Sequence, residues 1–183
     1  MIVNQEMRRY WQSKLSTDGA TPPTQITLRC MALLEGEPDE ILSVILRDES
    51  GTHWRVIALQ GSRLLALQAD SPHRDWSRES MKDRHPSADP VEVSVTAELR
   101  PLHEVTSVAL VPTGNDPTYF TSRAGDEGEA ERFYGGWQIA FRDGSRLDLG
   151  LEVSENYATM NTQHETAERI VRRLIEHLSS ASA

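Results

Sequence analysis

Cysteine is nearly absent from this sequence: its 183 residues include only Cys30. One cysteine excludes an intrachain disulfide and a cysteine-rich zinc site within one chain. Cys30 lies in the apolar stretch ITLRCMALL, and this setting predicts a buried small side chain. The alternative interpretation is a reactive thiol.

Basic charge is also scarce. The chain has 19 lysines and arginines against 28 aspartates and glutamates, for a formal net charge of -9. Proteins that bind the phosphate backbone of nucleic acids, or anionic lipid surfaces, need a dense basic surface. The charge therefore disfavours nucleic-acid binding and lipid binding, although an acidic chain can still carry a local basic patch.

Long hydrophobic runs are missing as well. Residues 1–12 hold no apolar run of signal-peptide length, and no window of the sequence resembles a membrane span. We therefore expect no membrane span and a cytoplasmic location.

The familiar catalytic motifs are absent too. The sequence shows no Walker phosphate loop, no Gly-x-Gly-x-x-Gly after a strand, no His-Glu-x-x-His and no Gly-x-Ser-x-Gly elbow. We predict that the protein is not an enzyme and has no catalytic residues and no cofactor.

Metal binding is also disfavoured. His73 and His85 share a loop with Asp75 and Asp83, but their spacing matches no zinc framework. The acidic run at 125–131 lacks the ligand spacing of an EF-hand. We predict solvent-exposed loop residues and no metal in either place.

What the sequence does contain is a series of strand-like segments. Short apolar or alternating runs, separated by turn residues, predict seven strands. They lie at 40–48, 52–61, 63–70, 91–99, 105–112, 136–141 and 146–153. Gly61-Ser62 predicts a tight hairpin turn, and Asp143-Gly144 predicts a turn with positive φ at both central residues.

Helical patterns lie at both ends of the chain. Met7, Tyr10, Trp11 and Leu15 recur at helical spacing within residues 1–15, whereas residues 25–38 fit either a helix or a strand. Near the C-terminus, Thr162 to Glu165 form a capping box that predicts a helix start. An apolar stripe follows at Ala167, Ile170, Val171, Leu174, Ile175 and Leu178. Arg169, Arg172 and Arg173 lie off this stripe and predict a solvated face, with a phosphate site as the alternative.

Together these elements predict a mostly β fold with α-helices. We expect a seven-stranded antiparallel, strongly bent barrel or sandwich capped by the C-terminal helix, with an N-terminal helical extension. Residues 1–34 would form the extension and residues 35–183 the domain.

The order of elements resembles the pleckstrin-homology-like (PH-like) fold of bacterial proteins over roughly residues 35–178. The resemblance is carried by LLEGEPDEILSVI with VIALQGSRLLALQAD, and by LHEVTSVAL with GWQIAFRDGSRLDLGL before the helix. It implies a binding or scaffolding module. Members that bind phosphoinositides use basic residues in the first hairpin loop, where this chain has the mixed stretch RDESGTHWR. The resemblance therefore implies protein–protein contact, with lipid binding unlikely.

Two long loops, at 71–90 and 112–136, carry aromatic residues in polar surroundings. Because such aromatics are typical interface anchors, we predict a protein-binding surface there. Its candidate residues are Trp76, Arg74, Tyr119, Phe120 and Arg123. The alternative for the aromatics is packing against their own domain. Two other functions stay open: self-association through Tyr10 and Trp11, and small-molecule binding or catalysis at an unrecognised site.

Overall fold

The computed structural model describes residues 5–17, 19–82, 93–111, 136–149 and 157–181. Seven strands lie at Glu40–Asp48 (β1), Gly51–Gln60 (β2), Arg63–Ser71 (β3), Ser94–Pro101 (β4), Val105–Val111 (β5), Gly136–Phe141 (β6) and Arg146–Leu149 (β7). Four α-helices lie at Gln5–Leu15 (α1), Thr24–Leu33 (α2), Arg78–Lys82 (α3) and Tyr157–Ala181 (α4), and a 3-10 helix at Leu102–Glu104 (η1). The seven predicted strands are confirmed within the described residues.

The strands form two antiparallel sheets rather than one closed barrel. A four-stranded sheet has the order β1-β2-β3-β4, and a three-stranded sheet has the order β5-β6-β7. No ladder joins the two sheets within the described residues, so the predicted barrel is not closed there. The chain passes from one sheet to the other at η1, where Pro101 cannot donate a ladder hydrogen bond.

Strand β2, in the interior of the four-stranded sheet, is buried on both of its faces. Successive strand residues point to opposite faces, and β2 is apolar in both sets. Trp54, Val56 and Ala58 belong to one core, whereas Ile57 and Leu59 belong to the other. This accounts for the nearly continuous apolar sequence of β2.

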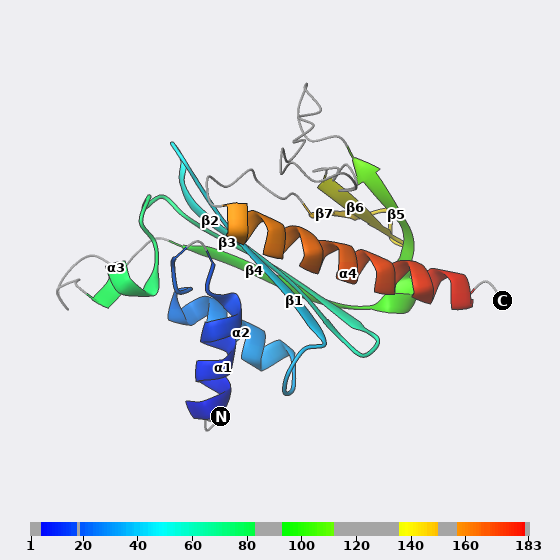
Figure 1. Cartoon of the computed structure of the whole chain (residues 1–183), viewed down its shortest axis with the longest axis horizontal. Coiled ribbons are helices and arrows are strands. Elements are labelled where there is room, and N and C mark those ends of the chain that lie inside the picture. The colour runs from blue at the N-terminus through cyan, green and yellow to red at the C-terminus, as the bar shows by residue number, and fades with distance from the viewer. Residues whose placement is uncertain (1–4, 18, 83–92, 112–135, 150–156, 182–183) are drawn as a thin grey trace, which may run out of the picture.

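One face is covered by the N-terminal helices (Figure 1). Trp11 and Leu15 of α1, with Ile26 and Cys30 of α2, are 0% exposed and pack against β2 and β3. The ambiguous segment is therefore a helix, and the burial of Cys30 is confirmed. Burial also raises the pKa of its thiol to about 12, so Cys30 is a core side chain rather than a reactive one.

The other face packs against the small sheet and α4. Leu42, Ile57 and Leu64 form one cluster with Ile139 and Leu149 of the small sheet. α4 contacts β1, β5 and η1, and it contributes the buried residues Ala167, Ile170, Val171 and Leu174 to the same core. The helix therefore seals one side of the space between the two sheets.

The α4 start differs from the prediction. The helix begins at Tyr157, so Thr162 lies inside it, and its carbonyl accepts a hydrogen bond from the Thr166 hydroxyl. The capping-box prediction is wrong because a helical turn already precedes Thr162. Ile175, predicted on the apolar stripe, is 47% exposed.

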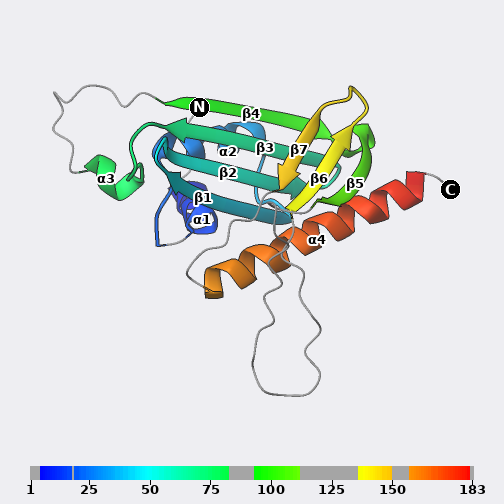
Figure 2. The same cartoon turned by 90° about the horizontal axis from the view of Figure 1, so that it is seen from above.

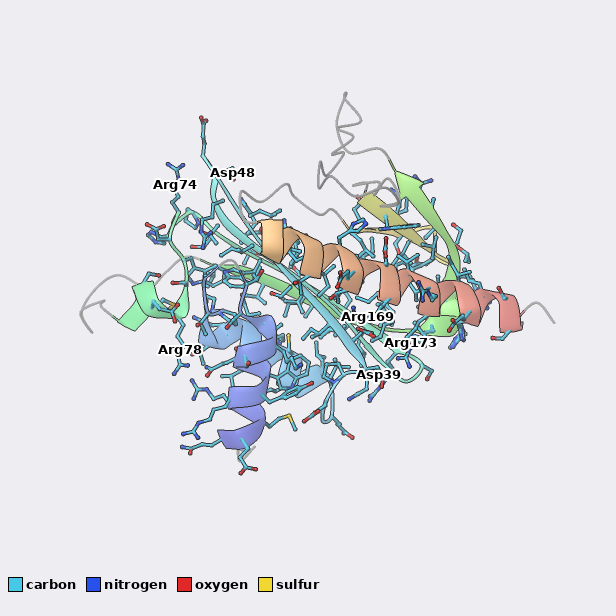
Figure 3. The ribbon with its side chains drawn as sticks, in the orientation of Figure 1. Asp39, Asp48, Arg74, Arg78, Arg169 and Arg173 are labelled. Carbon is cyan, nitrogen blue, oxygen red and sulfur yellow. The ribbon has the colours of Figure 1, made fainter. Side chains whose placement is uncertain are left out.

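Two of the three α4 arginines hold the helix to the start of β1. Arg169 pairs with Glu40 at 3.0 Å, and Arg173 pairs with Asp39 at 2.9 Å. Figure 3 labels Arg169, Arg173 and Asp39. The pKa of Asp39 is lowered, first by the Gly61 N–H and then by Arg173. These pairs favour a structural role for Arg169 and Arg173 over a phosphate site.

The two hairpin turns have different geometries. Gly61 and Ser62 form a two-residue loop between paired Gln60 and Arg63, with φ +56° at Gly61, as predicted. The β6–β7 turn is longer. Gly144 N–H donates to the Phe141 carbonyl, and Phe141 N–H donates to the Ser145 carbonyl. This pattern defines a three-residue loop with a bulge at Gly144, whose φ is +83°. The expected two-residue Asp-Gly turn is wrong.

Candidate functional site

A cleft of about 500 Å³ opens between the two sheets, on the side away from α4. Its apolar base comes from both sheets: Ile57, Leu64, Phe141 and Leu147 line it. In Figure 2, β6 and β7 cross over the four-stranded sheet and leave part of its face open. The rest of the lining is strongly polar and includes Arg55, Gln68, Glu98, Arg100, Arg146 and Asp148, so the cleft suits a ligand that offers polar as well as apolar groups.

Arg100 closes one end of the cleft. Its guanidinium pairs with Glu98 at 2.8 Å on its own strand and with Asp143 at 2.9 Å in the β6–β7 turn. It also lies 4.4 Å from the centre of the Phe141 ring, a cation–π distance. Arg100 therefore ties β4 to the small sheet. The pKa of Asp143 falls to about 2, chiefly because the Ser145 hydroxyl and N–H donate to it and then because of Arg100.

A second charged network adjoins the cleft at Arg55 and Gln68. Asp70 accepts hydrogen bonds from Arg55 at 2.9 Å and Gln68 at 2.9 Å, and it meets His53 Nδ1 at 2.6 Å. Burial acts to raise the pKa of Asp70, but the hydrogen bonds from Gln68, His53 and Arg55 together lower it. Because Arg55 and Gln68 also line the cleft, the network is continuous with it.

Part of this network has the connectivity of a Ser-His-Asp triad. His53 Nε2 lies 2.9 Å from the Ser50 hydroxyl, and Nδ1 faces Asp70. However, Asp48 accepts the Ser50 hydroxyl at 2.6 Å and also lies 3.3 Å from Nε2. With a carboxylate beside each ring nitrogen, the cationic form of the imidazole is favoured, and the pKa of His53 is raised, first by the hydrogen bond to Asp70.

An imidazolium cannot take the proton of a serine nucleophile, because both ring nitrogens already carry one. The hydroxyl proton of Ser50 is directed to Asp48 instead. The arrangement is therefore better suited to holding the β1–β2 hairpin against β3 than to acyl transfer.

The outer edge of β7, which pairs with no other strand in the described part of the chain, forms one wall of the cleft. Along an antiparallel ladder, residues that exchange hydrogen bonds alternate with residues that do not. Since Phe141 N–H donates to Ser145, the register of β6 and β7 assigns the ladder bonds to Leu147 and Leu149. The backbone N–H and C=O groups of Arg146 and Asp148 therefore point away from β6, and both residues line the cleft.

A second hollow, of about 400 Å³, lies between α4 and the N-terminal segment at Lys14, Ser16, Thr17 and Gly19. Its polar groups serve the fold. Gln163 donates to Thr17 at 2.9 Å and to the Ser43 carbonyl at 3.2 Å, and Ser43 donates to the Leu15 carbonyl. These bonds connect the N-terminal segment, β1 and α4, and they favour a structural role for this hollow.

The structure separates the residues predicted for partner binding. Trp76 is 1% exposed in the core beneath the N-terminal helices, so packing against its own domain is confirmed for this residue, and it is not a surface anchor. Arg74 is exposed, and its carbonyl accepts the Thr52 hydroxyl at 2.6 Å. Tyr119, Phe120 and Arg123 lie outside the described residues. Trp11, considered for self-association, is 0% exposed within its own chain.

Only some of the loop residues considered as metal ligands lie within the described part of the chain. His73 and Asp75 are exposed, whereas Asp83, His85 and the acidic run at 125–131 fall outside the described residues. Across the described ranges, no group of at least three His, Cys, Asp or Glu side chains is placed to hold a metal ion.

Comparison with protein-family models, curated proteins and solved structures finds no match for this chain. Among the described residues, no helix is both long enough and apolar enough to span a membrane.

Proposed function

We propose that this chain is a non-catalytic PH-like binding module that holds a protein partner in the cleft between its two sheets. The cleft carries the proposal: it joins an apolar base from both sheets to a polar rim and to a strand edge that has no paired neighbour among the described residues. Such a combination suits a polypeptide, which presents side chains and backbone groups together.

The arrangement of elements supports the PH-like part of the proposal. A four-stranded sheet is followed by a three-stranded sheet and a long C-terminal helix that seals one side. This is the order that the resemblance implies, although the two sheets are not joined into a barrel within the described residues.

The first hairpin supports a protein partner over an anionic lipid. Its end carries Asp48 and Ser50, and its one histidine is held between Asp48 and Asp70. Asp70 offsets the positive charge of Arg55, and Asp48 and Glu49 follow Arg47 at the hairpin end. This described hairpin is therefore mixed in charge and is not the dense basic cluster that lipid headgroups require.

Site-specific crosslinking tests the proposal. The only native thiol, Cys30, is 0% exposed with a pKa raised to about 12, so a Thr96→Cys variant carries one reactive thiol, on the exposed cleft side of β4. A photoactivatable maleimide attached there should crosslink one defined protein in native lysate. Ser180→Cys, exposed on α4, is the matched control and should not yield that product. Identical products from both positions, or none from Thr96→Cys, would contradict the proposal.

A further inference from the structure

We infer that the edge of β7 adds one extended peptide strand, held by its main chain inside the cleft. The pairing rests on the proposed binding function and names the part of the partner that the cleft receives. Arg146 and Asp148 supply two N–H donors and two C=O acceptors that face away from β6. These are the groups that a strand of another polypeptide satisfies by β-augmentation.

The surroundings of the edge favour a single strand. β7 lies over the four-stranded sheet (Figure 2), so an incoming chain passes between the β7 edge and that sheet. Below it lie Gln68, Thr96 and Arg55, which line the cleft. Side chains of an added strand alternate between this floor and the solvent.

A second copy of the chain fits this edge less well. Its own β7 also lies over a four-stranded sheet (Figure 2), so pairing two β7 edges would bring the two larger sheets toward each other. A peptide segment has no such sheet behind it. The occupant that the geometry points to is therefore an extended segment of a different protein.

The charged residues of the cleft also indicate which charge the bound peptide segment carries. Arg100 is paired with Glu98 and Asp143, and Arg55 is paired with Asp70. The Asp148 carboxylate accepts a hydrogen bond from the Gln138 amide at 2.8 Å. Arg146 is exposed and has no ionic partner among the residues that the structure describes.

Arg146 is therefore a positive charge at the β7 edge with no ionic partner among the described residues, whereas the neighbouring Asp148 carboxylate already accepts the Gln138 amide. Opposite charges on neighbouring strands attract one another across a sheet. The partner segment should carry an acidic side chain beside Arg146, on the solvent side of the added strand.

Proline at position 148 separates main-chain pairing from side-chain contact. Asp148→Pro removes the outward N–H and places ring atoms in its position, while the bonds of Leu147 and Leu149 to β6 are retained. Asp148→Ala is the matched control, since it loses the same carboxylate and the same Gln138 bond but keeps the N–H.

The probe is a phage-displayed library of random dodecapeptides, selected on the full chain, with affinities measured by fluorescence anisotropy. Selected peptides should bind Asp148→Pro at least ~10-fold more weakly than Asp148→Ala, the effect of one lost backbone interaction and a blocked edge. They should contain an acidic residue, and Arg146→Glu should weaken them further. In NMR spectra, the backbone amide signals of residues 146–149 should shift when peptide is added. Thermal melts should show that both position-148 variants are folded.

Several results would overturn the inference. One is equal binding to the two position-148 variants; another is signal changes that map away from β7; a third is a library that enriches no peptide. Concentration-dependent dimerisation that Asp148→Pro abolishes and Asp148→Ala retains would identify a second copy as the occupant instead. If Thr96→Cys still crosslinks a partner in any of these cases, the binding module stands and only the strand pairing fails.

Discussion

Arg100 of β4 donates to the Asp143 carboxylate of the β6–β7 turn across a distance of 2.9 Å. This contact joins two sheets that share no ladder within the described residues. Arg100→Ala removes it together with the Phe141 cation–π contact, which alone contributes about 0.5–1 kcal/mol. We expect a lower midpoint in urea unfolding and a more mobile turn at residues 142–145.

A double-mutant cycle with Asp143→Asn isolates the ion pair. Arg100→Ala should cost less in the Asp143→Asn background than in the wild type, because the pair is already lost. Strictly additive effects would show that the two side chains do not interact in solution.

The His53 network predicts a pH-dependent stability. The pKa of His53 is raised on folding, so its contribution is complete below the ordinary value of about 6.5 and is lost as the pH rises through the raised value. The pKa of Asp70 is lowered, so its contribution is lost in acid. We expect the pair to contribute most between about pH 4 and 6.5, by about 0.5–1 kcal/mol.

Thermal melts of His53→Gln and of His103→Gln, whose side chain is exposed, measure this effect. Only His53→Gln should remove the decline in stability above neutral pH that comes from this pair. An NMR titration that finds His53 at or below about 6.5 would disprove the assignment.

Trp76 predicts a stability effect rather than a binding effect. Its indole is 1% exposed, and its carbonyl accepts the Trp54 indole N–H at 3.1 Å. Trp76→Ala should lower the free energy of unfolding by about 3–5 kcal/mol because a large cavity remains. Trp76→Phe should cost much less, since the ring is largely replaced. A stable Trp76→Ala that has selectively lost a partner would point to a direct binding role.

Gly51 and Gly61 have positive φ in different surroundings. A Cβ at Gly51, where φ is +137°, would lie 1.9 Å from the Ser71 carbonyl oxygen, whereas at Gly61 it meets nothing within 4 Å. Gly61→Ala should cost about 1–2 kcal/mol from backbone conformation alone. Gly51→Ala should cost clearly more, because two backbone segments must move apart. Equal losses in denaturant titrations would mean that the contact with Ser71 is absent.

The β6–β7 hairpin predicts a structural role for its apolar face. Leu149 is 1% exposed in the core shared by both sheets and α4. Leu149→Ala should cost about 2–5 kcal/mol, and Leu149→Asp should prevent folding. Ile175→Ala on the exposed side of α4 should change the free energy of unfolding by less than about 0.5 kcal/mol. A circular dichroism spectrum showing that the Leu149→Asp variant is folded would contradict this assignment.

The strands were predictable because their apolar or alternating runs, and the turn residues between them, are local features of the sequence. The tertiary arrangement was not, since separating into two sheets or closing into a barrel changes none of those patterns. The β6–β7 turn was mispredicted because Asp143-Gly144 also suits a bulged loop in which only the glycine has positive φ.

The cleft could not be predicted from the sequence for a related reason. Arg55, Gln68 and Arg100 occupy alternating strand positions, and such residues normally indicate a solvated face. Only the placement of β7 above them makes that face the floor of a cavity. Trp76 was mistaken for a surface anchor because its sequence neighbours are polar, whereas its burial depends on α1 and α2, far away in the sequence.

The N-terminal helices cover one face of the four-stranded sheet, and this determines which residues must fold together. Trp54, Val56 and Leu65 are at most 1% exposed beneath the N-terminal helices. A fragment that starts at residue 35 would expose this apolar face of the sheet to water. Such a product should aggregate rather than behave as a trimmed domain, so the N-terminal helices are better regarded as the second half of the core than as an appendage.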